Sequence, residues 1–187
     1  MKQLIYILLT FFALSCKGQQ ILPLNTSAFS SPNNSYFKDI NNELNPYVGN
    51  WKANFQGKLI LLKITKELKV PFEIWNKNNF KDRLLVRYEI KDSNGIVLES
   101  SLNNDFNSKI KLLIEGSDIE NNSIRLIFAG GNCSVGIGEI VLKKIDDTQF
   151  YWSYYPGTTT RNDITCSPNL DYKIYLPETE NLVFTKQ

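Results

Sequence analysis

The residues of this chain that could carry out chemistry are carboxylates, hydroxyls and three cysteines, because histidine is absent from all 187 residues. Histidine is the commonest general base and the commonest transition-metal ligand. No Ser-His-Asp, Cys-His or histidine-zinc site can therefore form. Two carboxylate pairs are present, Asp146-Asp147 and Glu178 with Glu180. Carboxylates at such short spacings are usually solvated residues of turns or strands. We predict no catalytic residue, no cofactor and no metal site, and hence a protein that is not an enzyme.

The N-terminal residues have the pattern of an export signal. Lys2 is followed by an apolar run from Leu4 to Leu14, which only Thr10 interrupts, and the run leads through Ser15 to Cys16. As a helix this run would rise only about 16 Å, roughly half of a bilayer core, so it cannot be a stable membrane span. A basic start, a short apolar middle and a small residue before the cut are typical of a secretory signal peptide.

With cysteine directly after the small residue, the segment resembles a bacterial lipoprotein signal. In that family the cysteine is acylated and becomes the first residue of the mature protein. The resemblance implies a signal peptide at residues 1–15, a lipid anchor at Cys16 and contact with the membrane through the acyl chains. It also implies a cell-envelope location at the outer membrane, and Lys17-Gly18 after the cysteine favours the periplasmic face. An ordinary signal peptide with an incidental cysteine is the alternative.

If Cys16 carries lipid, Cys133 and Cys166 remain. In an oxidising compartment such a pair usually forms a disulfide, which would stabilise the fold by about 4 kcal/mol in the chain-entropy model. The glycine-rich segment 130–138 would then be a loop held by the bridge. A reactive thiol at Cys133 is the alternative, but no basic neighbour is present to lower its pKa.

Charge and size limit the partners and the domain count. The chain has 21 Lys and Arg against 19 Asp and Glu, and nucleic-acid binding depends on phosphate neutralisation, so we expect no nucleic-acid partner. About 170 mature residues suffice for one domain. Residues 16–46 are rich in Asn and Ser, with Pro23, Pro32 and Pro46 as breakers. We predict that they are a lipid anchor and polar tether, and that residues 47–187 are one monomeric β-domain.

Alternating apolar residues predict strand after strand from Tyr47 onward. The clearest alternation runs from Leu84 to Ile90 and leads into Asp92-Ser93-Asn94-Gly95, a hairpin signal because Asn-Gly tolerates positive φ. About ten short strands at spacings of roughly 8 to 14 residues, with no convincing helix, predict an antiparallel meander. We expect an all-β fold with a single up-and-down barrel, and a β-sandwich is the alternative.

One predicted strand is aromatic. Phe150, Trp152 and Tyr154 would share one face, and Tyr151 and Tyr155 the other. Tyrosine and tryptophan combine apolar area with a hydrogen-bonding tip, which suits a sugar, a lipid or a partner surface. Aromatic residues also favour sheets in general. Phe150, Trp152 and Tyr154 are therefore candidates either for ligand contact or for ordinary core packing.

The first predicted strand opens with Gly49-Asn50-Trp51. A glycine, any residue and a tryptophan at this place is similar to the first-strand signature of the lipocalins and calycins. In those proteins the tryptophan closes one end of an up-and-down barrel. Glycine lets the chain turn tightly while the indole caps the core. In that family an arginine packs across the tryptophan, and no arginine follows Leu182-Val183-Phe184 here.

A broader likeness is to uncharacterised lipoproteins from Bacteroidetes. It runs from Asn45 to Trp51, through Asp82 to Tyr88, and into the glycine-rich segment with Cys133. This likeness covers most of the mature chain and implies no activity.

Together these features predict a membrane-anchored, non-enzymatic binding module that holds a small apolar or amphipathic ligand inside a lipocalin-like barrel. The alternative is a structural or assembly lipoprotein that binds a protein or glycan through an exposed aromatic surface. An enzyme that uses carboxylates is a third hypothesis.

Overall fold

The computed structural model describes residues 18–107, 110–160, 164 and 166–187. Strands make up 50% of the chain and helix 4%, so the predicted all-β fold is confirmed. Helix is limited here to the 3-10 turns η1 (Asn45–Tyr47) and η2 (Asn132–Ser134). Within the described ranges, no helix has the length and apolarity that crossing a bilayer requires. The predicted signal peptide and Cys16 lie outside the described residues.

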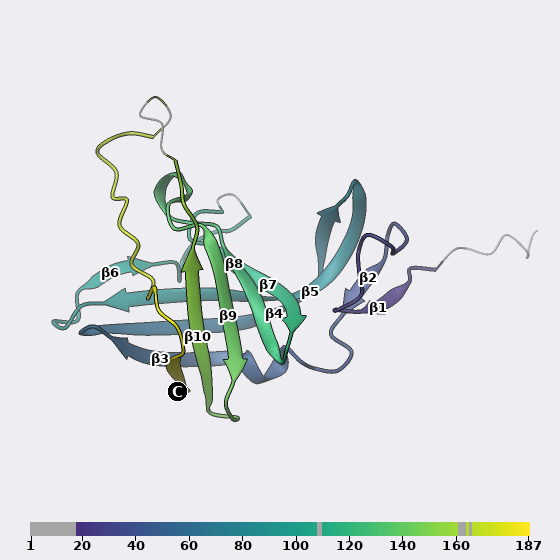
Figure 1. Ribbon diagram of the computed structural model, residues 1–187, viewed down its shortest axis with the longest axis horizontal. Coiled ribbons are helices and arrows are strands. Elements are labelled where there is room, and N and C mark those ends of the chain that lie inside the picture. The colour runs from purple at the N-terminus through teal and green to yellow at the C-terminus, as the bar shows by residue number, and fades with distance from the viewer. Residues whose placement is uncertain (1–17, 108–109, 161–163, 165) are drawn as a thin grey trace, which may run out of the picture.

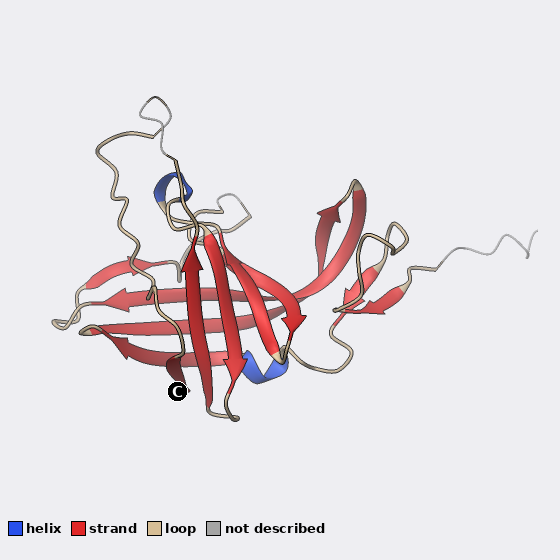
Figure 2. Ribbon diagram, viewed as in Figure 1, coloured by secondary structure: helices blue, strands red, loops and turns tan. Residues whose placement is uncertain are grey.

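Eight strands form a closed antiparallel barrel (Figures 1 and 2). The barrel strands are β3 (Gly49–Phe55), β4 (Lys58–Ile74), β5 (Lys77–Lys91), β7 (Ile114–Glu120), β8 (Ser123–Phe128), β9 (Gly138–Lys144), β10 (Gln149–Pro156) and β11 (Leu182–Lys186). Each pairs with the next along the chain, and β11 returns to pair with β3. This is the predicted up-and-down connectivity rather than a sandwich.

The short strand β6 (Val97–Ser100) pairs with β5 outside the closed circuit. The predicted turn at Asp92–Gly95 joins the two strands. Gly95 has a φ of 81°, and one carboxylate oxygen of Asp92 accepts hydrogen bonds from the backbone N–H groups of Asn94 and Ile96. The Asp92 side chain therefore supplies the hydrogen-bond acceptor for two backbone N–H groups of the turn.

Aromatic side chains fill much of the barrel interior. The rings of Phe150 and Phe184 stack with centroids 5.4 Å apart, and Trp51 meets Phe150 edge-on at 4.6 Å. Nearer the other end, Phe128 packs against Tyr154 at 6.0 Å. All five are at least 97% buried. The barrel is therefore packed by its own large side chains over the part of the core that these rings occupy.

Strands β4 and β5 extend beyond the barrel. They have 17 and 15 residues, whereas the other barrel strands have five to eight. β4 pairs with β3 only as far as Ile64, and beyond a bulge between Glu67 and Val70 the surplus leaves the barrel. We call residues 67–81 the arm (Figure 1). Apolar residues alternate over residues 60–64 and again over 70–74, a pattern typical of two strands, but the structure has one strand interrupted by this bulge.

The segment before the barrel is ordered against the arm, which differs from the flexible tether that its composition indicates. β1 (Ile21–Pro23) and β2 (Tyr36–Lys38) form a parallel pair, and β2 pairs in parallel with β5 at Phe80. The arm thus becomes part of a four-stranded extension. A lone two-stranded ribbon is marginal in water, and the added strands supply the missing partners.

A buried carboxylate joins this extension to the barrel. Asp82 is 1% exposed and accepts hydrogen bonds from the Tyr36 hydroxyl at 2.6 Å, the Asp39 N–H at 3.0 Å and the Lys69 N–H at 2.9 Å. Burial and the Asp82 contact raise the pKa of Tyr36 to about 12, so its hydroxyl stays protonated and donates. Asp39 in turn pairs with Lys66 at 2.6 Å. We call Asp82 and its three donors the Asp82 clamp.

Replacing Asp82 tests the clamp. Asp82→Asn leaves an amide N–H₂ facing groups that are themselves donors, so we expect the free energy of unfolding to fall by about 2 kcal/mol. Asp147→Asn is the matched control, because its side chain is 92% exposed and only pairs with Lys144; its effect should stay within about 0.5 kcal/mol. Chemical denaturation measures both. Equal losses would show that the Asp82 clamp contributes nothing specific.

Candidate functional site

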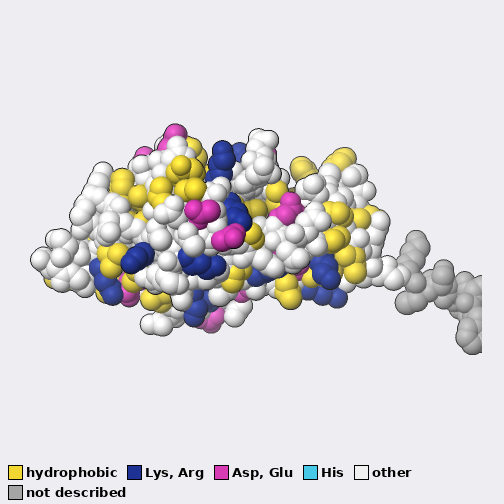
Figure 3. Space-filling model, turned by 90° about the horizontal axis from the view of Figure 1, so that it is seen from below, with side chains coloured by type: hydrophobic (Ala, Val, Ile, Leu, Met, Phe, Trp, Pro, Cys, Tyr) yellow, Lys and Arg dark blue, Asp and Glu magenta, His cyan; other side chains and the backbone are white. Residues whose placement is uncertain are grey.

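An open cleft of about 810 Å³ lies between the arm, the segment before the barrel and the outer wall of the barrel. The N-terminal segment contributes Leu24, Asn25, Thr26, Ala28 and Phe37; the arm and β5 contribute residues 70–74, Lys81 and Arg83; the barrel wall contributes residues 115–119, Arg125, Ile127 and Glu139. Three parts of the chain that are distant in sequence thus build one site. In the view from below, charged side chains of both signs gather in the middle of the molecule (Figure 3).

The arm side of the cleft is largely apolar. Phe72 packs edge-on against the buried ring of Phe37, with centroids 6.2 Å apart, and Leu24 is 5% exposed beneath them. Across the cleft, Ile127 of β8 faces outward from the barrel and is 55% exposed, whereas Ile119 of β7 pairs with the buried Ile124 and packs against the core. An outward isoleucine on a barrel strand leaves apolar area available to a ligand.

Six charged side chains of both signs line the cleft and form three ion pairs. We call these six residues the charged belt. The pairs are Lys81 with Asp118, Arg83 with Glu115, and Arg125 with Glu139. Burial raises the pKa of Glu115, and the charge of Arg83 opposes that rise. The charged belt holds three carboxylates in one cleft, but each has a cationic partner, which is the arrangement of a structural or binding surface.

A bulge in β7 places a hydroxyl in the wall of the cleft. The register shifts between Glu115 and Asp118, and Ser117 there is 1% exposed and lines the cleft. Its hydroxyl has no hydrogen-bond partner among the described atoms. Gly116 permits the bulge, because a Cβ there would lie 2.7 Å from the carbonyl oxygen of Arg125. A polar ligand atom could satisfy Ser117.

The polar composition of residues 117–122 is typical of a turn, but an interpretation of the whole segment as a turn is wrong. Most of the segment is strand β7, and the chain reverses at Asn121 and Asn122, which both have positive φ. Ile114 and Ile119 pack with the core, and Glu115, Ser117 and Asp118 line the cleft.

The aromatic strand points its predicted ligand-contacting side chains into the barrel. Phe150, Trp152 and Tyr154 are at most 1% exposed, and the indole N–H of Trp152 donates to the carbonyl of Pro177 at 3.4 Å. Of their neighbours on the other face, Tyr155 is 46% exposed. The three side chains form part of the packed core, and their burial counts against an outer binding surface made of them.

Gly49 and Trp51 lie at the end of the barrel where β11 returns to β3. Trp51 is 1% exposed, and its indole N–H donates to the carbonyl of Tyr47 at 2.8 Å. The ammonium of Lys186 lies 5.2 Å from the centre of the indole ring. A Cβ at Gly49 would come within 3.0 Å of the Lys186 side chain, so glycine leaves room for this cation–π contact.

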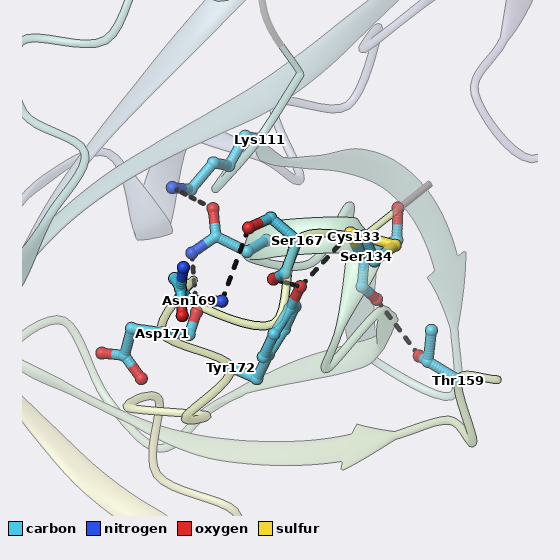
Figure 4. Close-up of a disulfide and its surroundings, with 10 residues drawn as sticks. Lys111, Cys133, Ser134, Thr159, Ser167, Asn169, Asp171 and Tyr172 are labelled. Atoms are coloured by element: carbon cyan, nitrogen blue, oxygen red, sulfur yellow. Dashed lines mark hydrogen bonds between the residues drawn. A yellow bond between two sulfur atoms is a disulfide. The ribbon is translucent and has the colours of Figure 1, made fainter. Parts of the chain in front are cut away.

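Cys133 and Cys166 form the predicted disulfide, which joins the loop after β8 to the long segment between β10 and β11 (Figure 4). Hydrogen bonds parallel the bridge. Lys111 donates to the side chain of Asn132 at 2.8 Å, and the Asn132 amide donates to the carbonyl of Asp171 at 2.6 Å. The loop containing residues 130–138 is thus held to the segment that crosses the mouth of the barrel.

Polar contacts close this mouth from inside. The hydroxyl of Tyr154 donates to the carbonyl of Gly136, and the hydroxyl of Tyr88 lies 2.7 Å from the carboxylate of Glu99. Burial raises the pKa of both Tyr88 and Glu99, which keeps the phenol protonated as a donor. The aromatic core therefore connects directly to the disulfide-held loop.

A family model matches residues 1–187 of this chain. The chain belongs to DUF6705, a family of unknown function. No curated protein and no solved structure matches it.

The carboxylate pairs noted in the sequence do not meet. Asp146 and Asp147 lie in the exposed turn between β9 and β10, and Glu178 and Glu180 are exposed before β11. Hydrogen bonds from Thr148 lower the pKa of Asp146. In the part of the chain that the structure describes, no group of three His, Cys, Asp or Glu residues could hold a metal ion.

Sequence reasoning did not find the cleft. Its charged residues are spread over β5, β7, β8 and β9 with ordinary strand alternation, and its apolar wall comes from a segment that looks like a linker. The one local signal was the outward-facing isoleucine at position 127, which alternation alone assigns to solvent.

The disulfide predicts the response of the protein to reduction. We expect Cys133 and Cys166 to resist alkylation in the native protein, and reduction to lower the free energy of unfolding by about 4 kcal/mol because the unfolded chain loses a cross-link. Peptide mass spectrometry reads the two sites separately from Cys16. A Cys133→Ser/Cys166→Ser variant should show the same loss without reductant, and labelling of either site before reduction would contradict the prediction.

Proposed function

We propose that this protein is a lipid-anchored, non-enzymatic binding module of the bacterial cell envelope, with the outer membrane as its site and Cys16 as its anchor. Its ligand is a small amphipathic molecule held in the cleft between the arm and the barrel. The resemblance of the sequence to Bacteroidetes lipoproteins and to the lipocalins is part of this proposal.

The observation that carries the ligand site is the composition of the cleft walls. The arm contributes the apolar ring of Phe72, and the barrel wall contributes the exposed Ile127 next to the charged belt. An apolar tail can cover Phe72 and Ile127, and a polar head can meet the charged belt and the Ser117 hydroxyl. Because the belt has both signs in close pairs, a zwitterionic head suits it better than a head with a single charge.

This site differs from the barrel interior that a lipocalin-like protein would use. Phe150, Trp152 and Tyr154 are packed against other aromatic rings there. The scaffold still supports the likeness, because Lys186 lies across Trp51 where the lipocalin pattern has an arginine. We therefore assign the barrel to support and the cleft to binding.

The anchor is supported by the sequence of residues 1–16, whose basic start, short apolar run and terminal cysteine match a lipoprotein signal. The disulfide is compatible with an exported protein, since such bridges persist in oxidising compartments.

A titration with dodecylphosphocholine below its micelle-forming concentration tests the cleft. We expect saturable binding by calorimetry, and Ile127→Ser should weaken it about tenfold because apolar contact area is lost. Val183→Ser is the matched control: Val183 is 39% exposed on β11 and does not line the cleft. If binding does not saturate, or if both substitutions weaken it equally, the cleft is not the ligand site.

Mass spectrometry of the protein isolated from bacterial membranes tests the anchor. We expect the mature chain to begin at Cys16 and to carry acyl chains on that residue. Cys16→Ser should abolish acylation, because serine lacks the thiol to which the lipid is attached. The protein should then shift from the membrane fraction to the soluble fraction. A mature chain that begins elsewhere would contradict the proposal.

A further inference from the structure

We propose that the tip of the extension, formed by Phe29 and Trp75, rests on the surface of the lipid bilayer and orients the cleft toward it. This surface goes beyond the acyl anchor, although the choice of a bilayer as its occupant rests on that anchor. We call Phe29 and Trp75 the aromatic tip.

The aromatic tip consists of the two most exposed aromatic side chains in the described part of the chain. Phe29 is 72% and Trp75 67% exposed, and their rings meet edge-on at 6.0 Å. Trp75 lies at the turn between β4 and β5, and Phe29 lies in the loop between β1 and β2. Large aromatic groups exposed together are expensive in water unless something covers them.

The aromatic tip is held in place by the backbone beneath it. The ammonium of Lys77 donates to the carbonyl of Phe29 at 2.7 Å and to that of Ser31 at 2.7 Å. The Asn78 N–H donates to the side chain of Asn33 at 2.8 Å. These contacts join the loop that carries Phe29 to the turn that carries Trp75, so the pair is presented as one rigid surface.

The chain brings its proposed anchor to the same end of the molecule. Gly18 and Gln19 line a pocket with Asn33 and Asn34, next to the loop and turn just described. Gly18, the first described residue, lies at this end of the extension (Figure 1), where hydrophobic side chains gather on the surface (Figure 3). Cys16 precedes Gly18 by two residues, and two residues span at most about 7 Å, so a bilayer that holds acyl chains on Cys16 would meet the protein at this end.

The chemistry of the aromatic tip fits a membrane surface. Tryptophan is enriched at the boundary between headgroups and acyl chains, because its ring is apolar and its N–H can hydrogen-bond to the headgroup region. The acyl chains proposed on Cys16 hold the protein at the bilayer, and the aromatic tip adds a second contact that fixes the orientation of the molecule. The arm and the loop before β2 also form one wall of the cleft, so this contact places the cleft beside the bilayer.

The tryptophans of the protein provide a selective probe. The chain has three, and Trp51 and Trp152 are at most 1% exposed inside the barrel, so Trp75 alone can meet lipid. We expect vesicles of phosphatidylcholine brominated along the acyl chain to quench part of the fluorescence of the full, natively processed chain. Trp75→Phe should abolish this quenching and Phe29→Ser should reduce it, while Ile96→Ser, which removes an exposed isoleucine at the β5–β6 turn, should not change it.

Flotation of the same samples separates this proposal from the anchor. Protein that floats with the vesicles and shows no quenching overturns the aromatic tip and leaves the anchor intact. Quenching at high lipid concentration without flotation of the Cys16-bearing protein supports the aromatic tip and overturns the anchor. A dimer that forms through Trp75 in sedimentation, with no quenching by brominated lipid, shows that a second copy covers the aromatic tip and overturns the bilayer contact.

Discussion

The Asp82 clamp is the interaction on which the candidate binding cleft depends. Asp82 accepts from the bulge in β4 at Lys69, from the Tyr36 hydroxyl and from the backbone at Asp39. These three donors belong to two separate parts of the chain, the overlong hairpin and the segment before the barrel. A buried carboxylate must be fully hydrogen-bonded, so the clamp is satisfied only when both parts are in place. The cleft exists because this condition fixes the extension at a set position beside the barrel wall.

Packing inside the barrel explains why the candidate site is outside it. Trp51, Phe150 and Phe184 fill one end of the interior, and Tyr154 with Phe128 extends the packing toward the mouth. An interior at this density has no room for a ligand of useful size along those contacts. The surplus length of β4 and β5 gives the molecule a second concave surface without opening the core. The barrel then serves as a rigid wall, which favours a preformed site over one that must be ordered on binding.

The two ends of the molecule are organised by different forces. At the barrel mouth, the Cys133–Cys166 disulfide and the Asn132 contacts hold the long segment before β11 in place. At the extension, buried hydrogen bonds and added strands take that role, and the exposed aromatic tip lies on this side. The proposed anchor, aromatic tip and cleft are contiguous along the extension. In the proposed arrangement, an amphipathic ligand can pass between bilayer and cleft without crossing open water.

Period-two alternation and turn residues by themselves determine an antiparallel meander, through the run from Leu84 to Ile90, the Asn94-Gly95 turn and the spacing of the strands. The pairing of β11 with β3, which closes the barrel and excludes the sandwich, is a result of the tertiary structure. The cysteine count predicts the Cys133–Cys166 bridge, and the burial of Phe150, Trp152 and Tyr154 follows from the alternation that puts them on one face. Only the tertiary structure decided that residues 18–46 are ordered, because their partners, Asp82 and β5, are distant in sequence. It also decided where the cleft lies. Alternation predicts which side chains point away from the core. What these side chains face depends on how far β4 and β5 extend beyond the barrel. That length is set by pairing between strands and not by any local sequence pattern.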